Sequence, residues 1–176
     1  ADSFHMGNVF VKAQGVDFNG ISDMDKHDIL LNYNVLHHAG VDFDNQLLTS
    51  EKDFEDYSVE YLRKLKEKTD LMVFQMGSNW GGNKQKPIVP LSDDAEKIGL
   101  NAKMFKKSGW EIVDISIHTR KNGILEYKAI EKEVVDLIND CKIGDETSII
   151  TEKVDLSELP SLSEFYRRSI FVVKSI

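Results

Sequence analysis

The stretch that most constrains the fold is residues 28–38, in which a buried strand runs directly into polar side chains. Ile29, Leu30 and Leu31 form an unbroken apolar run, which is typical of a central strand in a parallel sheet. The polar residues that follow the run are Asn32, Asn34, His37 and His38. Because ligands of open α/β sheets bind at the carboxyl ends of such strands, this stretch predicts a ligand site at its end.

The rest of the chain predicts strands and helices in alternation. Strands are expected near residues 9–14, 28–35, 71–76, 110–118, 124–129, 148–151 and 169–175. Helices are expected from about residue 54, after the helix-start pattern Ser50–Asp53, from the N-cap Ser92, and from Ile130 to Cys141. An Asn-Gly turn at residues 122–123 predicts a hairpin.

Composition excludes several classes of protein. The 176 residues are enough for one domain with a real core, and 41% of them are hydrophobic. A net charge of −8 argues against a non-specific nucleic-acid or anionic-membrane binder. The single cysteine, Cys141, rules out an internal disulfide, and no apolar run reaches membrane-spanning length. We therefore expect a cytoplasmic protein that binds neither nucleic acid nor membrane.

The organising stretch resembles the fourth strand of class I S-adenosylmethionine-dependent methyltransferases. That strand commonly reads Asp, two hydrophobic residues, a few more residues and then Val-Leu-His-His, as Asp28 to His38 does here. Upstream, a strand ending in Gly15-Val16-Asp17 resembles the third strand of the same family. In that family the acidic residue at this position accepts a hydrogen bond from the adenine amino group. The alternative for Asp17 is a turn aspartate that satisfies its own loop backbone.

The resemblance implies an α/β fold with a Rossmann-like methyltransferase sheet, mostly parallel with an antiparallel last strand. The third to seventh strands of the family would lie near residues 8–16, 28–35, 71–76, 110–118 and 169–175. Residues 1–176 would form a single methyltransferase-like domain. Residues of about 119–165 would be an insertion that covers the substrate.

The family's strongest signature is absent from this sequence. Class I methyltransferases carry an acidic-x-Gly-x-Gly-x-Gly loop after the first strand, and nothing upstream of Val9 supplies it. The chain then lacks the first strands and carries about half of a cofactor site. A sheet without those strands exposes an edge strand, so we expect a partner chain or a missing amino-terminal segment to complete it.

The resemblance also implies a set of site residues. His37 and His38 would be catalytic, because a histidine suits proton removal near neutral pH. The cofactor S-adenosylmethionine would be bound by Asp17, Phe18, Asn32 and Asn34. The alternative for the histidine pair is structural, with one ring packed on the sheet and the other capping a turn.

Two other features argue against different chemistries. The glycine-rich segment Gly77–Asn83 is followed by Lys84–Pro90, with two prolines and no helix, so it does not fit a phosphate-binding loop. We interpret it as a flexible loop in which Trp80 either covers a ligand or packs. His5, His27 and His118 lack partners at metal-ligand spacing, so no metal site is predicted.

Three functions remain open from the sequence. The first is a methyltransferase, or the carboxyl-terminal half of one, acting on a small-molecule or sugar-like acceptor. The second is a non-catalytic methyltransferase-like binding or scaffold subunit, which the missing glycine loop favours. The third is an unrelated acidic α+β binding domain. The methyl acceptor and the oligomeric state do not follow from the sequence.

Overall fold

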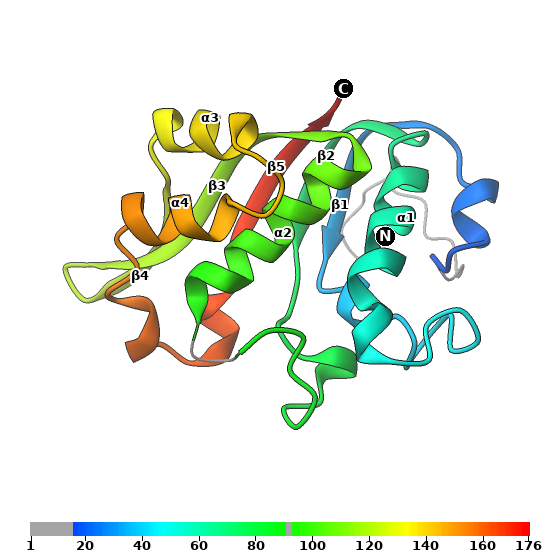
Figure 1. Cartoon of the computed structure of the whole chain (residues 1–176), viewed down its shortest axis with the longest axis horizontal. Coiled ribbons are helices and arrows are strands. Elements are labelled where there is room, and N and C mark those ends of the chain that lie inside the picture. The colour runs from blue at the N-terminus through cyan, green and yellow to red at the C-terminus, as the bar shows by residue number, and fades with distance from the viewer. Residues whose placement is uncertain (1–15, 91–92) are drawn as a thin grey trace, which may run out of the picture.

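The computed structural model describes residues 16–90 and 93–176, which form a five-stranded mixed sheet with four α-helices in front of it (Figure 1). The strands are β1 (His27–Tyr33), β2 (Thr69–Gln75), β3 (Trp110–Lys121), β4 (Ile124–Ala129) and β5 (Ile170–Ser175). The helices are α1 (Phe54–Leu65), α2 (Asp94–Ser108), α3 (Lys132–Asp140) and α4 (Glu146–Lys153). The strand expected at residues 9–14 lies outside the described residues.

The strand order in the sheet is β1-β2-β5-β3-β4. Only β1 and β2 pair in parallel, and the other three pairs are antiparallel. The expectation of a mostly parallel sheet was therefore wrong. The reason is that β5 inserts between β2 and β3 and runs opposite to both, while β4 folds back on β3 through Asn122 and Gly123, both at positive φ. The last strand is antiparallel to its neighbours, as expected, and β1, β2 and β3 share one direction.

Helices α1, α2 and α3 lie where the sequence indicates helices. α1 buries an aromatic and aliphatic stripe and carries Glu55 and Asp56 in its first turn, where the helix dipole favours acidic side chains. α2 is capped by Asp93, whose side chain accepts a hydrogen bond from the Glu96 amide, whereas the expected cap Ser92 lies outside the described residues. α2 ends at Gly109, which takes the left-handed conformation with φ of 80°.

The core lies between the helices and the sheet. Three phenylalanine side chains are fully buried there: Phe74 of β2, Phe105 of α2 and Phe171 of β5. The centroid of the Phe105 ring lies 5.1 Å from that of Phe74 and 5.4 Å from that of Phe171. Trp110 at the start of β3 is also buried, and its indole N–H donates to the Leu62 carbonyl of α1 at 3.0 Å. These contacts join α1, α2 and three strands into one domain.

The short strand expected at residues 148–151 is instead part of α4, so that expectation was wrong. Its β-branched residues resemble a strand locally. In the structure, however, Ile150 is fully buried in the core and α4 packs on α2. Glu146 in the first turn of α4 is also buried, and its carboxylate lies 3.4 Å from Lys106 Nζ. These distant contacts decide the local conformation.

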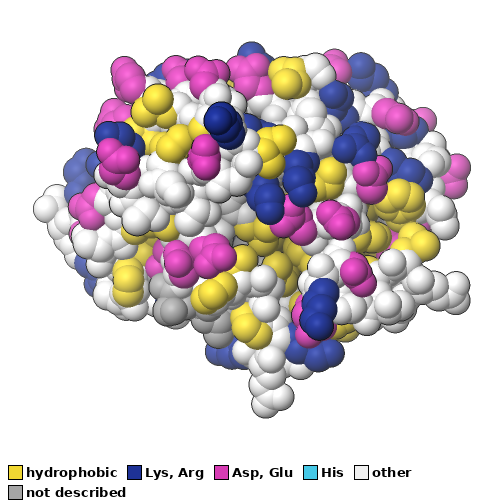
Figure 2. Space-filling model, viewed as in Figure 1, with side chains coloured by type: hydrophobic (Ala, Val, Ile, Leu, Met, Phe, Trp, Pro, Cys, Tyr) yellow, Lys and Arg dark blue, Asp and Glu magenta, His cyan; other side chains and the backbone are white. Residues whose placement is uncertain are grey.

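The sheet has two different faces. Over the helix-covered face, Lys and Arg side chains alternate with Asp and Glu side chains, as Figure 2 shows. We call the opposite side the open sheet face. The strand register and the alternation of side chains along each strand show which residues lie on it. It carries Ile29, Leu31 and Tyr33 of β1, Leu71, Val73 and Gln75 of β2, and Ile170, Val172 and Lys174 of β5.

Candidate functional site

The carboxyl ends of β1 and β2 and the start of β5 meet at one edge of the sheet (Figure 1). Three side chains bind one another there. The Asn34 amide donates to Gln75 Oε1 at 3.1 Å and accepts from Arg168 Nη1 at 2.8 Å. Gln75 in turn donates to the Tyr127 hydroxyl at 2.8 Å, so the network reaches β4. Both polar atoms of the Asn34 amide are thus bonded within the protein, where they hold strand ends together.

Asn34 also turns the backbone at this edge. Its φ is 58°, a left-handed conformation that asparagine tolerates better than most residues. Its own N–H donates to the Gln75 carbonyl at 2.7 Å, which extends the β1–β2 pairing by one residue. The turn directs the chain into the 3-10 helix η3 (Leu36–His38), which carries the histidine pair.

His37 is buried, with 2% of its surface exposed. Its Nδ1 accepts a hydrogen bond from the Gly77 amide at 3.3 Å, and a Cβ on Gly77 would lie only 2.7 Å from its Nε2. Burial, together with the nearby charges of His38 and Arg168, lowers the pKa of His37 from 6.5 to about 3, against the opposing effect of Asp42. His37 is therefore neutral and packed, which suits a structural role better than proton transfer.

His38 has a different environment. Its side chain is one-third exposed, and its Nδ1 lies 2.6 Å from a carboxylate oxygen of Asp42, although outside the angular range of a hydrogen bond. A carboxylate on the Nδ1 side of a histidine leaves Nε2, on the other side of the ring, available for a proton. Of the two histidines named by the sequence, His38 is the one with a partly exposed ring and a carboxylate beside it.

The glycine-rich loop packs on the histidine segment. Trp80 is buried with 5% exposed, and its indole N–H donates to the Ala39 carbonyl at 2.6 Å. Gly81 adopts a positive φ of 59°, and a Cβ there would meet Val41 at 2.6 Å. Of the two roles considered for Trp80, packing is the one observed. The ring fixes the loop beside His38, in place of the flexible loop expected from the sequence.

Asp17 and Phe18 lie on the flank of α1, where no described contact joins them to the histidine pair. The Asp17 carboxylate accepts from the Gly20 amide at 2.5 Å, which is the turn contact named as the alternative for this residue. The Phe18 amide donates to the Asp44 carboxylate at 2.7 Å, and the Lys64 ammonium lies 3.8 Å from the centre of the Phe18 ring.

Asn32 has a buried polar atom that is not used. It is buried in β1 with 5% exposed, and its Oδ1 has no hydrogen-bond partner among the described residues. A buried amide oxygen without a partner is costly, so such an atom marks a place where a ligand or a water donates. Asn32 lies on the helix side of β1, one strand position before Tyr33 on the open sheet face.

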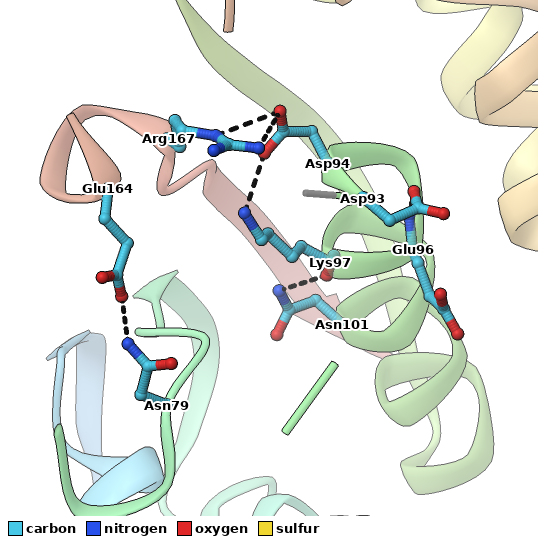
Figure 3. A network of polar contacts seen from close by, with 8 residues as sticks. All are labelled: Asn79, Asp93, Asp94, Glu96, Lys97, Asn101, Glu164 and Arg167. Atoms are coloured by element: carbon cyan, nitrogen blue, oxygen red, sulfur yellow. Dashed lines mark hydrogen bonds and ion pairs between the residues drawn. The ribbon is translucent and has the colours of Figure 1, made fainter. Parts of the chain in front are cut away.

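A buried ionic network, which the sequence analysis missed, fixes the residues that precede β5. Arg167 binds the carboxylate of Asp94 through two nitrogens, at 2.9 Å and 2.7 Å, and Lys97 Nζ lies 3.0 Å from the same group (Figure 3). Nearby, Asn79 donates to the carboxylate of Glu164. The segment before β5 is thereby tied to α2 and to the glycine-rich loop. Arg167 and Asp94 are 73 residues apart in the sequence, so no local pattern indicates their pairing.

The expected insertion supplies most of the lining of one cavity. Residues of β3, β4, α3, α4 and the segment after α4 enclose about 260 Å³. Its floor is apolar, and its rim carries Lys128, Glu131, Lys153, Asp155 and Glu158. Neither His37 nor His38 lines this space. The cavity lined by the insertion is therefore separate from the histidine pair.

Comparison with known proteins gives no relative for this chain: no protein-family model, no curated protein and no solved structure matches it. No helix among residues 16–90 and 93–176 is long and apolar enough to span a membrane. Function therefore has to be inferred from the residues and geometry described above.

Proposed function

We propose that this chain is a class I S-adenosylmethionine-dependent methyltransferase, or the carboxyl-terminal half of one, that acts on a small-molecule or sugar-like hydroxyl. One observation carries the proposal. The strands assigned by resemblance as fourth, fifth and sixth correspond to β1, β2 and β3, which share one direction. The strand assigned as last corresponds to β5, which is antiparallel to its neighbours.

The cofactor would contribute an electrophilic methyl group on a sulfonium, and the chain offers two groups toward it. Asn32 has an unpaired, buried amide oxygen at the end of β1, which can accept a hydrogen bond from a ligand. Asp17 uses one carboxylate oxygen in its turn, and the other is available for the adenine amino group that the resemblance implies. Two acceptors make part of a site. The remainder would come from a partner chain or an amino-terminal segment beside β1.

His38 would act as the general base. The cofactor, when bound, would supply the methyl group, and His38 Nε2 would accept the proton of the acceptor hydroxyl. Asp42 at the Nδ1 side would orient the ring and stabilise its protonated form. Much of the acceleration in such an in-line displacement comes from positioning, which the fixed Gly77–Asn83 loop would supply.

A non-catalytic binding subunit is the second candidate. The observation that favours it is the Asn34 amide, which is fully engaged by Gln75 and Arg168 and so presents no polar atom to a cofactor. The absence of the acidic-x-Gly-x-Gly-x-Gly motif from the sequence points the same way.

Isothermal titration with S-adenosylhomocysteine separates the two candidates. It should be carried out on this chain alone and on the chain together with any sequence that precedes it in its gene. Binding that is lost in Asn32→Ala but retained in Asp23→Ala, an exposed acidic control, supports the methyltransferase. Absence of binding in both preparations supports the non-catalytic subunit.

A second experiment tests the base. In a preparation that binds the cofactor, His38→Ala should lower the rate of methyl transfer by about 100-fold or more, because a general base contributes on that scale. His27→Ala is the matched control, since His27 is exposed at the start of β1. Equal rates for the two variants would remove His38 from the mechanism.

A further inference from the structure

The open sheet face is apolar where a solvated sheet face is ordinarily polar. Three side chains of β1 stand out from it, with Ile29 55% exposed, Leu31 63% and Tyr33 44%. On the neighbouring strand β2, the register places Leu71, Val73 and Gln75 next to these side chains. On the following strand β5, it places Val172 and Ile170 next to Val73 and Gln75. All four α-helices lie on the other side of the sheet (Figure 1). A contiguous exposed apolar patch of this kind marks a site of protein association.

The apolar surface extends beyond the width of one helix. On β4, Tyr127 is 40% exposed, and its ring lies 3.9 Å from that of His118 on β3. Tyr166, before β5, is 41% exposed and packs edge-on to the same histidine at 5.3 Å. A single helix about 10 Å wide covers about two strands. The exposed aromatic rings thus continue across more strands than one helix would cover, so a second sheet fits the surface better.

Two opposite charges on this face neutralise each other. Lys174 and Glu111 are cross-strand partners that form an ion pair at 3.1 Å. Asp114 on β3 lies opposite Val172, at the margin of the apolar area. The chain as a whole carries a net charge of −8. An area with little net charge on a strongly acidic protein is where two identical copies can approach with the least repulsion.

We propose that the open sheet face binds a second copy of this chain, in a two-fold dimer with the sheets packed face to face. Five strands about 4.8 Å apart and about seven residues long span roughly 500 Å². Two copies would then bury on the order of 1,000 Å², which reaches the lower limit for a specific interface and corresponds to a weak dimer. Sheets packed in this way lie about 10 Å apart with interdigitated side chains.

The dimer does not depend on the proposed methyltransferase activity. Face-to-face packing uses the surface of the sheet and leaves the outer edge of β1 free, so a cofactor-binding segment could still add to that edge. Tyr33 and Gln75 lie at the border between the open sheet face and the histidine site. The second copy would therefore limit access to the site from one side.

Sedimentation equilibrium of the purified chain tests the proposal. The wild type should show a monomer–dimer equilibrium with a dissociation constant in the range of about 1–100 µM. Leu31→Glu replaces the most exposed apolar side chain of β1 by a charge in both copies, so it should weaken association by about 100-fold or more. Leu137→Glu is the matched control, because Leu137 is 47% exposed on α3 in the helix layer.

A second variant of the same face, Ile29→Lys, shows whether a loss of the dimer is specific to Leu31→Glu. Circular dichroism melting of all variants measures whether each one still folds. Loss of the dimer in both face variants with unchanged melting, and its retention in Leu137→Glu, would support the proposal. A wild type that stays monomeric up to about 100 µM would overturn it and leave the face to a different protein. A dimer that survives both face variants would overturn it as well.

Discussion

Acid should destabilise this protein through His37 well before its carboxylates titrate. The pKa of His37 is about 3 in the folded protein, against 6.5 for an ordinary histidine. Between pH 6.5 and pH 3, His37 is therefore protonated in the unfolded chain but neutral in the folded protein. The stabilisation is present in full above pH 6.5 and is lost as pH falls toward 3. Between pH 7 and pH 5, this one group should lower the free energy of unfolding by about 2 kcal/mol.

The measurement is urea unfolding at pH 7, 6 and 5, for the wild type and for His37→Asn. Asparagine places an amide oxygen near the position of Nδ1, so it can still accept the hydrogen bond from Gly77, but it does not titrate. The other titratable groups, such as His118, are common to both proteins and cancel in the comparison. The wild type should lose about 2 kcal/mol more than the variant over this range.

Parallel pH profiles of the two proteins would refute this reasoning, because His37 would then titrate alike in the folded and unfolded states. An NMR titration gives a direct check on the folded protein. A midpoint for the His37 ring above about pH 5 would mean that its burial and the charges of His38 and Arg168 have a much smaller effect than the structure implies.

Three further predictions concern stability. Gly77→Ala should lower the free energy of unfolding by about 2 kcal/mol in urea, because its Cβ would lie 2.7 Å from His37 Nε2, and a loss below about 0.5 kcal/mol would contradict that packing. Asp94→Asn should cost about 3 kcal/mol, since Arg167 would lose its bidentate partner in a buried setting; an unchanged melting temperature would count against it. Trp80→Phe should cost about 1 kcal/mol through the lost indole hydrogen bond, and equal urea midpoints would show that this bond contributes nothing.

Local sequence patterns were sufficient for most elements of this fold. The capped, amphipathic α1 and α2 and the Asn122–Gly123 hairpin each follow from residues close together in the chain. The strand order does not, because β5 pairs with β2 and β3 across long sequence separations. α4 was missed for the same kind of reason, since the burial of Ile150 depends on α2 rather than on its sequence neighbours.

The candidate site shows the same limit. The sequence identified the histidine pair but could not distinguish its members, because adjacent residues have the same local pattern. In the structure, His37 is buried against Gly77, whereas His38 is partly exposed and lies beside the Asp42 carboxylate. Asp42 is four residues from His38, so that pairing was the one signal that could have been found in advance. The partners of Asn34, in β2 and before β5, come from distant segments that only the folded sheet brings together.

The central position of β5 has a consequence for how the protein is made. β5 follows all other strands in the sequence, yet it lies between β2 and β3 and provides the hydrogen bonds that join them. The 95 residues from Gln75 to Ile170 (170 − 75) would take the ribosome roughly 5–20 s to add. Until β5 is made, the β1–β2 pair and the β3–β4 hairpin have no strand between them, and the edges of β2 and β3 that will pair with β5 stay unpaired. The nascent chain therefore exposes these strand edges until β5 emerges and closes the sheet.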